Sequence, residues 1–324
     1  MAGLRLCEPT ELYNILNQYA RLCRLAEPNY LCLLDARTQR EFDESHIITA
    51  RKIEQSPTGE YLVPDLEELE CVRYCVVYDG ETSSLDFCDN EKEESEKGAS
   101  ASSEIENAET SSLYSLNAEE GTAVRYGRDL EQFTRHPVLI LTGGYRRFTA
   151  CYHFLRTQKL FWMPQELDNL KPYPVEILPA KLYMGNFKQA CDPKILKDLK
   201  IKAQVNISKQ PTALFAEDKL LHISVADSPD ADLFSHFSTI CHFVDAQINY
   251  GAVLVFSNLG ISRSSTVIMA YLMHSSQFTL KEAWEYVRKC KTNMRPNRGF
   301  VKQLSDWETR IYGITITDIS EPNY

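Results

Sequence analysis

The sequence predicts an α/β protein built from two domains. The chain has 324 residues, enough for two domains of ordinary size, and its hydrophobic content of 44% supplies a core for each. In both halves a short apolar run typical of a buried strand is followed by a polar or helical segment, at residues 31–53 and again at 251–272. Residues 164–174 carry prolines at both ends and predict a stiff linker between the halves.

The N-terminal half contains three strand-like runs, residues 31–35 (LCLLD), 74–79 (YCVVYD) and 138–141 (VLIL). A short polar helix and the sequence Ser-His-Ile follow the first run, and a Gly-Gly turn follows the third. This order resembles the rhodanese-type domain that precedes the catalytic domain in MAP-kinase phosphatases, which implies such a domain over residues 1–163. A working rhodanese carries a cysteine where Asp79 stands, so sulfur transfer is not expected.

An acidic segment interrupts this half. Residues 81–120 hold twelve acidic and two basic side chains, together with eleven serines and threonines. Such a composition cannot bury enough apolar surface to order itself, so we predict a disordered insert within the N-terminal domain. It accounts for the net charge of −10 by itself. A solubilising spacer and a segment regulated by phosphorylation, for example at Ser103, remain alternative interpretations.

The C-terminal half contains the most informative stretch, residues 251–272 (GAVLVFSNLGISRSSTVIMAYL). The pattern predicts a buried strand, a tight loop and a helix. Gly260 permits a positive φ, successive backbone N–H groups of such a loop attract anions, and the helix N-terminus adds its positive dipole end. Arg263 offers a planar fork for two phosphate oxygens. The candidate phosphate-binding residues are Ser257, Asn258, Leu259, Gly260, Ile261, Ser262, Arg263 and Ser264.

This loop resembles the phosphate-binding loop of the cysteine-dependent protein tyrosine phosphatases, His-Cys-x-x-Gly-x-x-Arg-Ser/Thr. Ser257 stands at the position of the nucleophilic cysteine, and Phe256 at that of the histidine. Further motifs match dual-specificity phosphatases in order: residues 175–186, 201–208, 222–227 and 295–297. The resemblance implies a domain of this family over residues 175–312 and a C-terminal tail over 313–324. It also implies the general-acid position for Asp227 and loop support for Asn297.

The two substitutions argue against catalysis. A thiolate can form at a helix N-terminus, whereas a serine hydroxyl stays protonated unless an adjacent base activates it. Phe256 has no titratable group to act as that base. We therefore expect no catalytic residues and treat Asp227 as a turn residue in an unused acid position. The leading hypothesis is a pseudophosphatase that binds signalling proteins, and the alternatives are an interaction module without phosphate binding and a weak serine-dependent phosphatase.

Partners and location are expectations of a general kind. The resemblance implies phosphoproteins, phosphatases or kinases as partners, but Arg51 and Lys52 are the only basic pair near the kinase-docking position, so MAP-kinase docking is not expected. No basic stripe indicates nucleic acid, and no apolar run reaches the about 18 residues of a membrane span. The ten scattered cysteines predict no metal site, cofactor or disulfide. We expect an intracellular, cytoplasmic protein, with mitochondrial import as the alternative.

Overall fold

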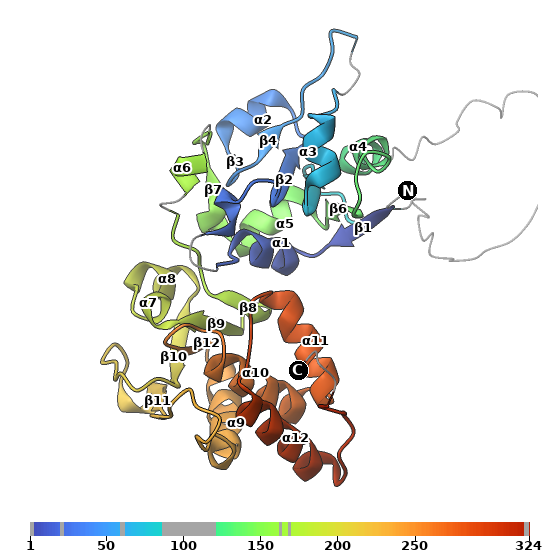
Figure 1. Ribbon diagram of the computed structural model, residues 1–324. Coiled ribbons are helices and arrows are strands. Elements are labelled where there is room, and N and C mark those ends of the chain that lie inside the picture. The colour runs from blue at the N-terminus through green and yellow to red at the C-terminus, as the bar shows by residue number, and fades with distance from the viewer. Residues whose placement is uncertain are drawn as a thin grey trace, which may run out of the picture. The chain divides into compact units, whose positions relative to one another are not determined.

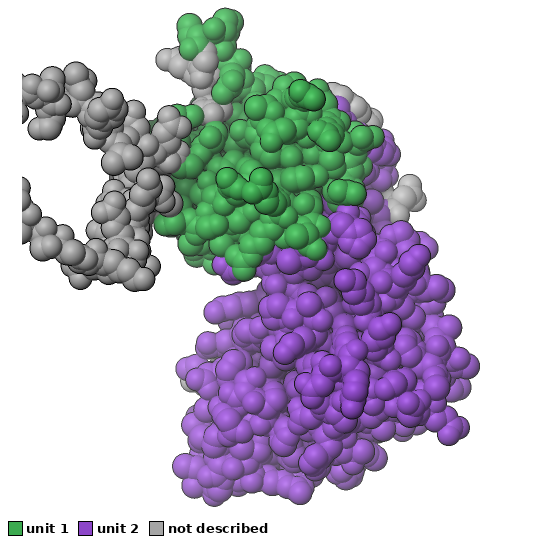
Figure 2. Space-filling model, turned by 180° about the vertical axis from the view of Figure 1, so that it is seen from behind, with its two compact units in different colours: residues 1–7, 31–150, 156–158 green, residues 8–30, 151–155, 159–324 purple. Residues whose placement is uncertain are grey.

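The chain divides into two compact units. The computed structural model describes residues 3–19, 23–58, 62–85, 121–161, 164–167, 170–320 and 324. The first unit comprises residues 1–7, 31–150 and 156–158, and the second comprises residues 8–30, 151–155 and 159–324 (Figure 2). Each unit is built around a five-stranded sheet flanked by helices, so the predicted α/β class is confirmed (Figure 1).

The sheet of the first unit is parallel throughout, in the order β1-β6-β5-β2-β4. Its strands are β1 (Leu4–Cys7), β2 (Leu31–Asp35), β4 (Arg51–Lys52), β5 (Tyr74–Tyr78) and β6 (Val138–Leu141). The helices are α2 (Gln39–Glu44), α3 (Leu66–Cys71), α4 (Thr122–Leu130) and α5 (Gly144–Cys151), and β3 (His46–Ile47) pairs with β7 (Arg156–Thr157). The central strands are buried on both faces, which explains why they read as continuous apolar runs.

The sheet of the second unit has the order β11-β10-β12-β9-β8, with β8 antiparallel to its neighbour and the other strands parallel. The strands are β8 (Val175–Leu178), β9 (Leu182–Asn186), β10 (Ile201–Asn206), β11 (Leu220–His222) and β12 (Ala252–Ser257). The helices are α1 (Pro9–Leu16), α6 (Pro164–Leu167), α7 (Phe187–Ala190), α8 (Pro193–Asp198), α9 (Phe234–Ile248), α10 (Arg263–Ser275), α11 (Leu280–Cys290) and α12 (Arg298–Tyr312). Short 3-10 segments lie at Arg24–Ala26, His153–Leu155 and Glu217–Lys219.

Helix α10 is the central helix of the second unit. It is buried from Arg263 to Met273 and packs against α9, α11 and α12 (Figure 1). A helix that is covered on all sides needs apolar residues around its whole circumference, as the sequence VIMAYLM supplies. Because β12 is also fully buried, the loop between β12 and α10 is held at both ends by core packing.

The units differ from the sequence-based boundaries in three places. Residues 8–30 group with the second unit, although the boundary at residue 163 had assigned them to the first. Part of the predicted linker forms helix α6. The predicted tail is anchored, because the backbone N–H groups of Ile316 and Thr317 donate to Glu308 Oε2 at 3.0 and 2.8 Å. Most of the predicted insert, residues 86–120, lies outside the described residues.

Buried polar side chains explain why residues 8–30 group with the second unit. Tyr13 Oη donates to the carbonyl of Pro174 at 2.8 Å, and Gln18 Nε2 donates to that of Cys290 at 2.9 Å. Asn14 makes two hydrogen bonds of 2.8 Å with the backbone of Glu176, one in each direction.

Within the described part of the chain, no helix has both the length and the apolar character needed to cross a lipid bilayer.

Candidate functional site

The candidate site lies where β12 ends and α10 begins. Strand β12 runs between β10 and β9, and parallel sheets bind ligands outside the carboxyl ends of such strands. A pocket of ≈ 460 Å³ opens there. Its lining residues are Asp227, Ser257, Asn258, Leu259, Ile261, Ser262, Arg263, Arg295, Pro296 and Asn297. The fold thus brings together the predicted loop, the acid position and the loop-supporting asparagine, which are far apart in the sequence.

Ser257 lies at the base of this pocket and is only 2% exposed. Its hydroxyl donates to Ser264 Oγ at 3.3 Å, and no hydrogen bond among the described residues connects it to a basic group. Phe256 is fully buried, with its ring 5.9 Å from that of Phe187 in an edge-on contact. Neither neighbour provides a base that could take the proton from the Ser257 hydroxyl.

At one position of the loop, the backbone conformation and the lack of space allow only glycine. Gly260 has φ +68°, and a Cβ there would lie 2.5 Å from the carbonyl oxygen of Gly185. Two backbone hydrogen bonds hold the rest of the loop: Phe187 N donates to Asn258 O at 3.3 Å, and Arg295 N donates to Ile261 O at 3.0 Å. The predicted tight turn is therefore present, and backbone hydrogen bonds within the chain hold it.

Arg263 is a buried cation with spare hydrogen-bonding capacity. Only 7% of the residue is exposed, and Nη1 donates to the carbonyl of Val225 at 2.8 Å. Its Nε is buried without a hydrogen-bond partner and lies 3.8 Å from Asp227 Oδ2. Burial lowers the pKa of the guanidinium, and Asp227 opposes that shift. Because an unsatisfied buried donor costs about 1–3 kcal/mol, an oxyanion accepting from Nε would stabilise the site.

Asp227 is engaged inside the pocket. Its Oδ1 accepts from Ser262 Oγ at 2.7 Å and from Asn297 Nδ2 at 2.9 Å. The other end of the Asn297 amide accepts from Phe300 N at 3.0 Å and caps α12. Asp227 therefore joins the loop to α12, and its carboxylate also places a negative charge beside Arg263.

Two further residues shape the pocket. Arg295 lines it as an exposed second cation, whereas the sequence had placed this residue only within a buttressing element. The sequence signal that could have identified Arg295 as a pocket residue was its position two residues before Asn297. Leu259 stands at the pocket with 73% of its surface exposed, so an apolar side chain borders a polar cavity.

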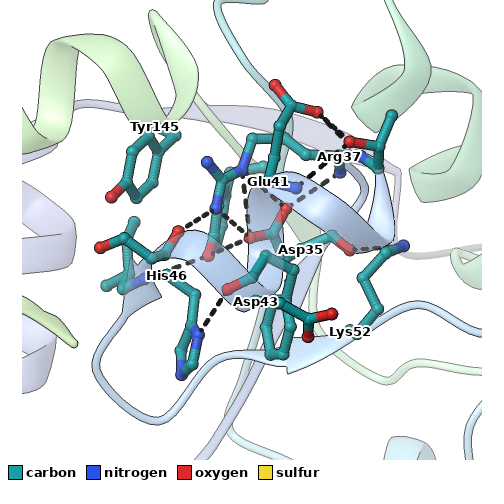
Figure 3. A network of polar contacts seen from close by, with 12 residues as sticks. Asp35, Arg37, Glu41, Asp43, His46, Lys52 and Tyr145 are labelled. Carbon is teal, nitrogen blue, oxygen red and sulfur yellow. Dashed lines mark hydrogen bonds and ion pairs between the residues drawn. The ribbon is translucent and has the colours of Figure 1, made fainter. Parts of the chain in front are cut away.

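The first unit carries a polar network at the carboxyl end of β2 (Figure 3). The buried carboxylate of Asp35 accepts from Arg37 Nη2 at 2.6 Å and from Tyr78 Oη at 2.7 Å. Arg37 also donates to the carbonyl of Ser45 at 2.7 Å and lies 3.7 Å from the centre of the Tyr145 ring (Figure 3). These contacts use the guanidinium to fix the segment after β2, so the network has a structural role.

The loop after β5 contains its own anion. The Asp79 carboxylate accepts from the backbone N–H groups of Glu81, Thr82 and Ala123 at 3.1, 2.9 and 3.0 Å, and from Thr82 Oγ1 at 2.6 Å. The donors that would cradle an external anion are thus already satisfied. An aspartate cannot carry a persulfide, so this geometry favours the expectation that the first unit transfers no sulfur.

One family model matches the region of the chain that contains the site. Residues 182–310 match the family model described as "Dual specificity phosphatase, catalytic domain". The second unit therefore contains a domain of the dual-specificity phosphatase family. The chain also resembles a protein whose name combines this domain with a rhodanese domain, which supports the predicted rhodanese-like first unit.

Individual relatives are similar over part of their length. Human dual specificity protein phosphatase 5 is 42% identical over 142 residues, 43% of this chain and 36% of that protein. The probable rhodanese domain-containing dual specificity protein phosphatase of Dictyostelium discoideum is 30% identical over 178 residues, 54% of this chain and 37% of that protein. The crystal structure of human tyrosine phosphatase-like serine/threonine/tyrosine-interacting protein aligns with a TM-score of 0.38 and 28% identity, covering 43% of this chain and 97% of that one. The alignments thus span little more than a third of the two curated relatives.

Proposed function

We propose that this chain is a pseudophosphatase whose phosphatase domain binds phosphorylated proteins without cleaving them and so regulates or scaffolds signalling complexes. The observation that carries the proposal is the hydroxyl of Ser257 at the base of the pocket, hydrogen-bonded to another hydroxyl. Attack on a phosphate ester from this position needs an anionic nucleophile. A serine reaches that state only with an adjacent general base, and the buried Phe256 offers none.

Retained binding is supported by the electrostatics of the pocket. Arg263 lines the pocket and its Nε has no hydrogen-bond partner, Arg295 adds a second cation, and α10 presents its N-terminus to the loop. Two cations face one carboxylate, Asp227, so the lining has a positive balance. A phosphate dianion would satisfy the orphaned donor while the ester bond stays intact.

A second candidate function is a protein-interaction module that binds no phosphate. The observation that favours it is the position of Asp227, whose carboxylate already lies 3.8 Å from Arg263 Nε and repels an incoming dianion. The exposed apolar side chain of Leu259 at the pocket is consistent with protein contact. A weak serine-dependent phosphatase is the third reading, and it requires a base that Ser257 lacks in its described surroundings.

One experiment separates the three functions. Calorimetric titration with vanadate and with a phosphotyrosine peptide is compared between wild type, Arg263→Ala and Arg310→Ala, the last removing an arginine outside the pocket. We expect 1:1 binding that weakens at least about tenfold only in Arg263→Ala, as loss of a charge-assisted contact predicts, with no hydrolysis of an aryl phosphate. Equal, negligible binding by all three proteins would favour the interaction module. Hydrolysis that disappears in Ser257→Ala would favour the weak enzyme.

The partner class follows from the same proposal. The whole chain resembles the serine/threonine/tyrosine-interacting-like type of pseudophosphatase, which suggests phosphoproteins, phosphatases or kinases as partners. Both basic side chains near the kinase-docking position have internal partners: Arg51 Nη2 donates to Glu68 Oε1 at 2.7 Å, and Lys52 Nζ to the carbonyl of Ile53 at 2.8 Å. These contacts leave little charge free for MAP-kinase docking by this route. A pull-down survey with wild type and Arg263→Ala identifies the phosphate-dependent partners.

A further inference from the structure

Three neighbouring strands of the first unit place two thiols and a guanidinium side by side. Cys32 on β2 and Cys75 on β5 are direct partners in the parallel ladder, and Arg51 on β4 is the partner of Leu34, two residues beyond Cys32. Side chains alternate between the faces of a strand, so Cys32 and Leu34 project from the same face. Both thiols are buried, with 0% and 2% of Cys32 and Cys75 exposed.

Arg51 links the Cys32 sulfur to the surface. Its Nη2 donates to Cys32 Sγ at 3.0 Å, and its two terminal nitrogens donate to the Glu68 carboxylate at 2.7 and 3.0 Å. The side chains of Arg51 and Glu68 are 49% and 32% exposed. The guanidinium is thus held only at a half-exposed ion pair, and exposed ion pairs of this kind are worth only about 0–1 kcal/mol.

The surroundings shift the pKa values of the two thiols in opposite directions. The hydrogen bond from Cys75 and the charge of Arg51 lower the pKa of Cys32, against the opposing effects of burial and Glu68. The contact with Cys32 and burial raise the pKa of Cys75 well above its ordinary value. Tyr126 of α4 also faces the pair, and burial followed by the two sulfurs raises its pKa. Cys32 is therefore the more acidic thiol of the pair, and Cys75 the less acidic one.

Two other buried thiols, Cys241 and Cys290, have their pKa shifted in the opposite direction to that of Cys32. Cys241 lies within the core of the second unit, where burial raises its pKa to about 12. Burial likewise raises the pKa of Cys290 to about 12. A thiolate is the reactive form of cysteine, so these two residues are inert although they are the same residue type.

We propose that Cys32 and Cys75 form a peroxide-reactive dithiol, a modification site independent of the phosphate pocket. The Cys32 thiolate attacks one oxygen of a hydroperoxide ROOH, the O–O bond breaks, and Cys32 becomes a sulfenic acid while RO⁻ takes up a proton to leave as ROH. The Cys75 thiol then attacks the Cys32 sulfur, an S–S bond forms, and the sulfenic oxygen leaves as water. In sum, two thiols and ROOH give one disulfide, ROH and water.

The strand geometry suits the second step. Neighbouring strands lie about 4.7–4.9 Å apart, within the Cα separation of about 4.4–6.8 Å that disulfides span. Because Cys32 and Cys75 are register partners, this separation applies to them without a shift along either strand. The resolving thiol is thus already beside the sulfur that would be oxidised.

The test measures which cysteines react in the full chain. Cys71, Cys88 and Cys151 are first replaced by serine to remove background, since Cys71 and Cys151 are exposed. The folded protein is then treated with hydrogen peroxide and digested for mass spectrometry. We expect a Cys32–Cys75 cross-linked peptide that disappears on reduction with dithiothreitol. In the Cys75→Ser variant, dimedone should instead label Cys32 as a sulfenic acid.

Two comparisons make the result decisive. Arg51→Met should slow the oxidation of Cys32 by about tenfold or more, since each unit of pKa changes the thiolate fraction about tenfold. Arg135→Met removes the matched surface pair between Arg135 and Glu70, 2.7 Å apart, and should leave the rate unchanged. The proposal is overturned if Cys32 oxidises no faster than Cys241, if it pairs with another cysteine, or if Arg51→Met reacts as fast as the parent.

Discussion

The two residues at which this loop departs from the phosphatase motif, Phe256 and Ser257, are adjacent in the chain but lie in different surroundings. Ser257 faces the pocket and touches Ser264, whereas Phe256 is buried against Phe187. The hydroxyl can be exchanged without repacking, because sulfur is only slightly larger than oxygen. Replacement of the phenyl ring alters a packed contact. The proposed inactivity thus rests on chemistry at residue 257, whereas a substitution at residue 256 also depends on packing.

The first prediction restores the missing chemistry. Phe256→His combined with Ser257→Cys should hydrolyse a small aryl phosphate at least about 100-fold faster than wild type, because the helix N-terminus stabilises a thiolate and Asp227 can protonate the leaving oxygen. Initial rates measured with the folded, monodisperse double variant check this. Adding Asp227→Asn to the double variant provides the control and should lower the rate again. A folded double variant without activity would show that other residues of the pocket block catalysis.

The second prediction concerns Lys291, a buried lysine after α11. Burial lowers its pKa from 10.5 to about 8. Between these values the unfolded chain binds the proton that the folded chain has released, so the free energy of unfolding should rise as pH increases from about 8 to about 10. Lys291→Met should remove this rise and stabilise the protein at pH 7 by about 3 kcal/mol.

Urea denaturation at a series of pH values measures the effect of Lys291. The control is Lys289→Met, because Lys289 lies two residues earlier, in the last turn of α11, and is exposed. It should leave the pH profile parallel to that of wild type. A parallel profile for Lys291→Met as well would contradict a charge penalty at this position.

At the scale of elements, the pocket depends on the connection between β12 and α10. Both elements are buried over most of their length, so the five residues between them must make a tight reversal. Gly260 makes the reversal over the end of β9, and Arg295 and Phe187 hold the loop through backbone hydrogen bonds. The shape of this loop is therefore set by packing within the chain.

The third prediction tests that shape. Gly260→Ala should lower the free energy of unfolding by about 2–4 kcal/mol, because a left-handed backbone costs an L-residue about 1–2 kcal/mol and the added Cβ meets the backbone of Gly185. Vanadate binding should be lost with it.

A substitution at a second glycine measures the cost of the left-handed backbone without the steric clash that a Cβ at residue 260 would cause. Gly313 has φ +78° with open space where a Cβ would project, so Gly313→Ala should cost only about 1–2 kcal/mol and leave binding intact. Thermal and urea unfolding compare the two variants. Equal costs for both would mean that the contact with Gly185 is relieved by a backbone shift.

At the scale of the whole molecule, segments that follow one another in the chain belong to different units. The chain enters the first unit with β1, contributes residues 8–30 to the second unit and returns to the first at β2. Asn14 binds the backbone of the edge strand β8 in both directions, in the way that a neighbouring strand would. The second unit is therefore completed by residues that precede most of the first unit.

The fourth prediction tests this completion. Asn14→Ala should lower the free energy of unfolding of the second unit by about 2–5 kcal/mol, because it leaves a buried N–H and a buried carbonyl of Glu176 unsatisfied. Asn249→Ala removes an exposed contact of 3.3 Å to the carbonyl of Asp245 and should cost less than about 0.5 kcal/mol. Tryptophan fluorescence follows this unit, since Trp284 and Trp307 lie in its core. A cost for Asn14→Ala no larger than that of the control would contradict the docking role.

The sequence by itself determined the α/β class, the phosphate-loop pattern and the loss of a nucleophile and its neighbour, because residue identity and local periodicity carry that information. It also indicated that Asp79 replaces a cysteine. These features depend on residues that are adjacent in the chain, so they can be read without knowing the fold.

Only the tertiary structure decided how distant groups are satisfied. Asp227 accepts from Ser262 and Asn297, which lie 35 and 70 residues away. Residues 8–30 join the second unit through hydrogen bonds to partners more than 150 residues away, and Cys32 obtains its cation from a neighbouring strand. Local propensity is silent on such contacts, because their free energy arises only when packing brings buried donors and acceptors together and removes the water that would otherwise satisfy them.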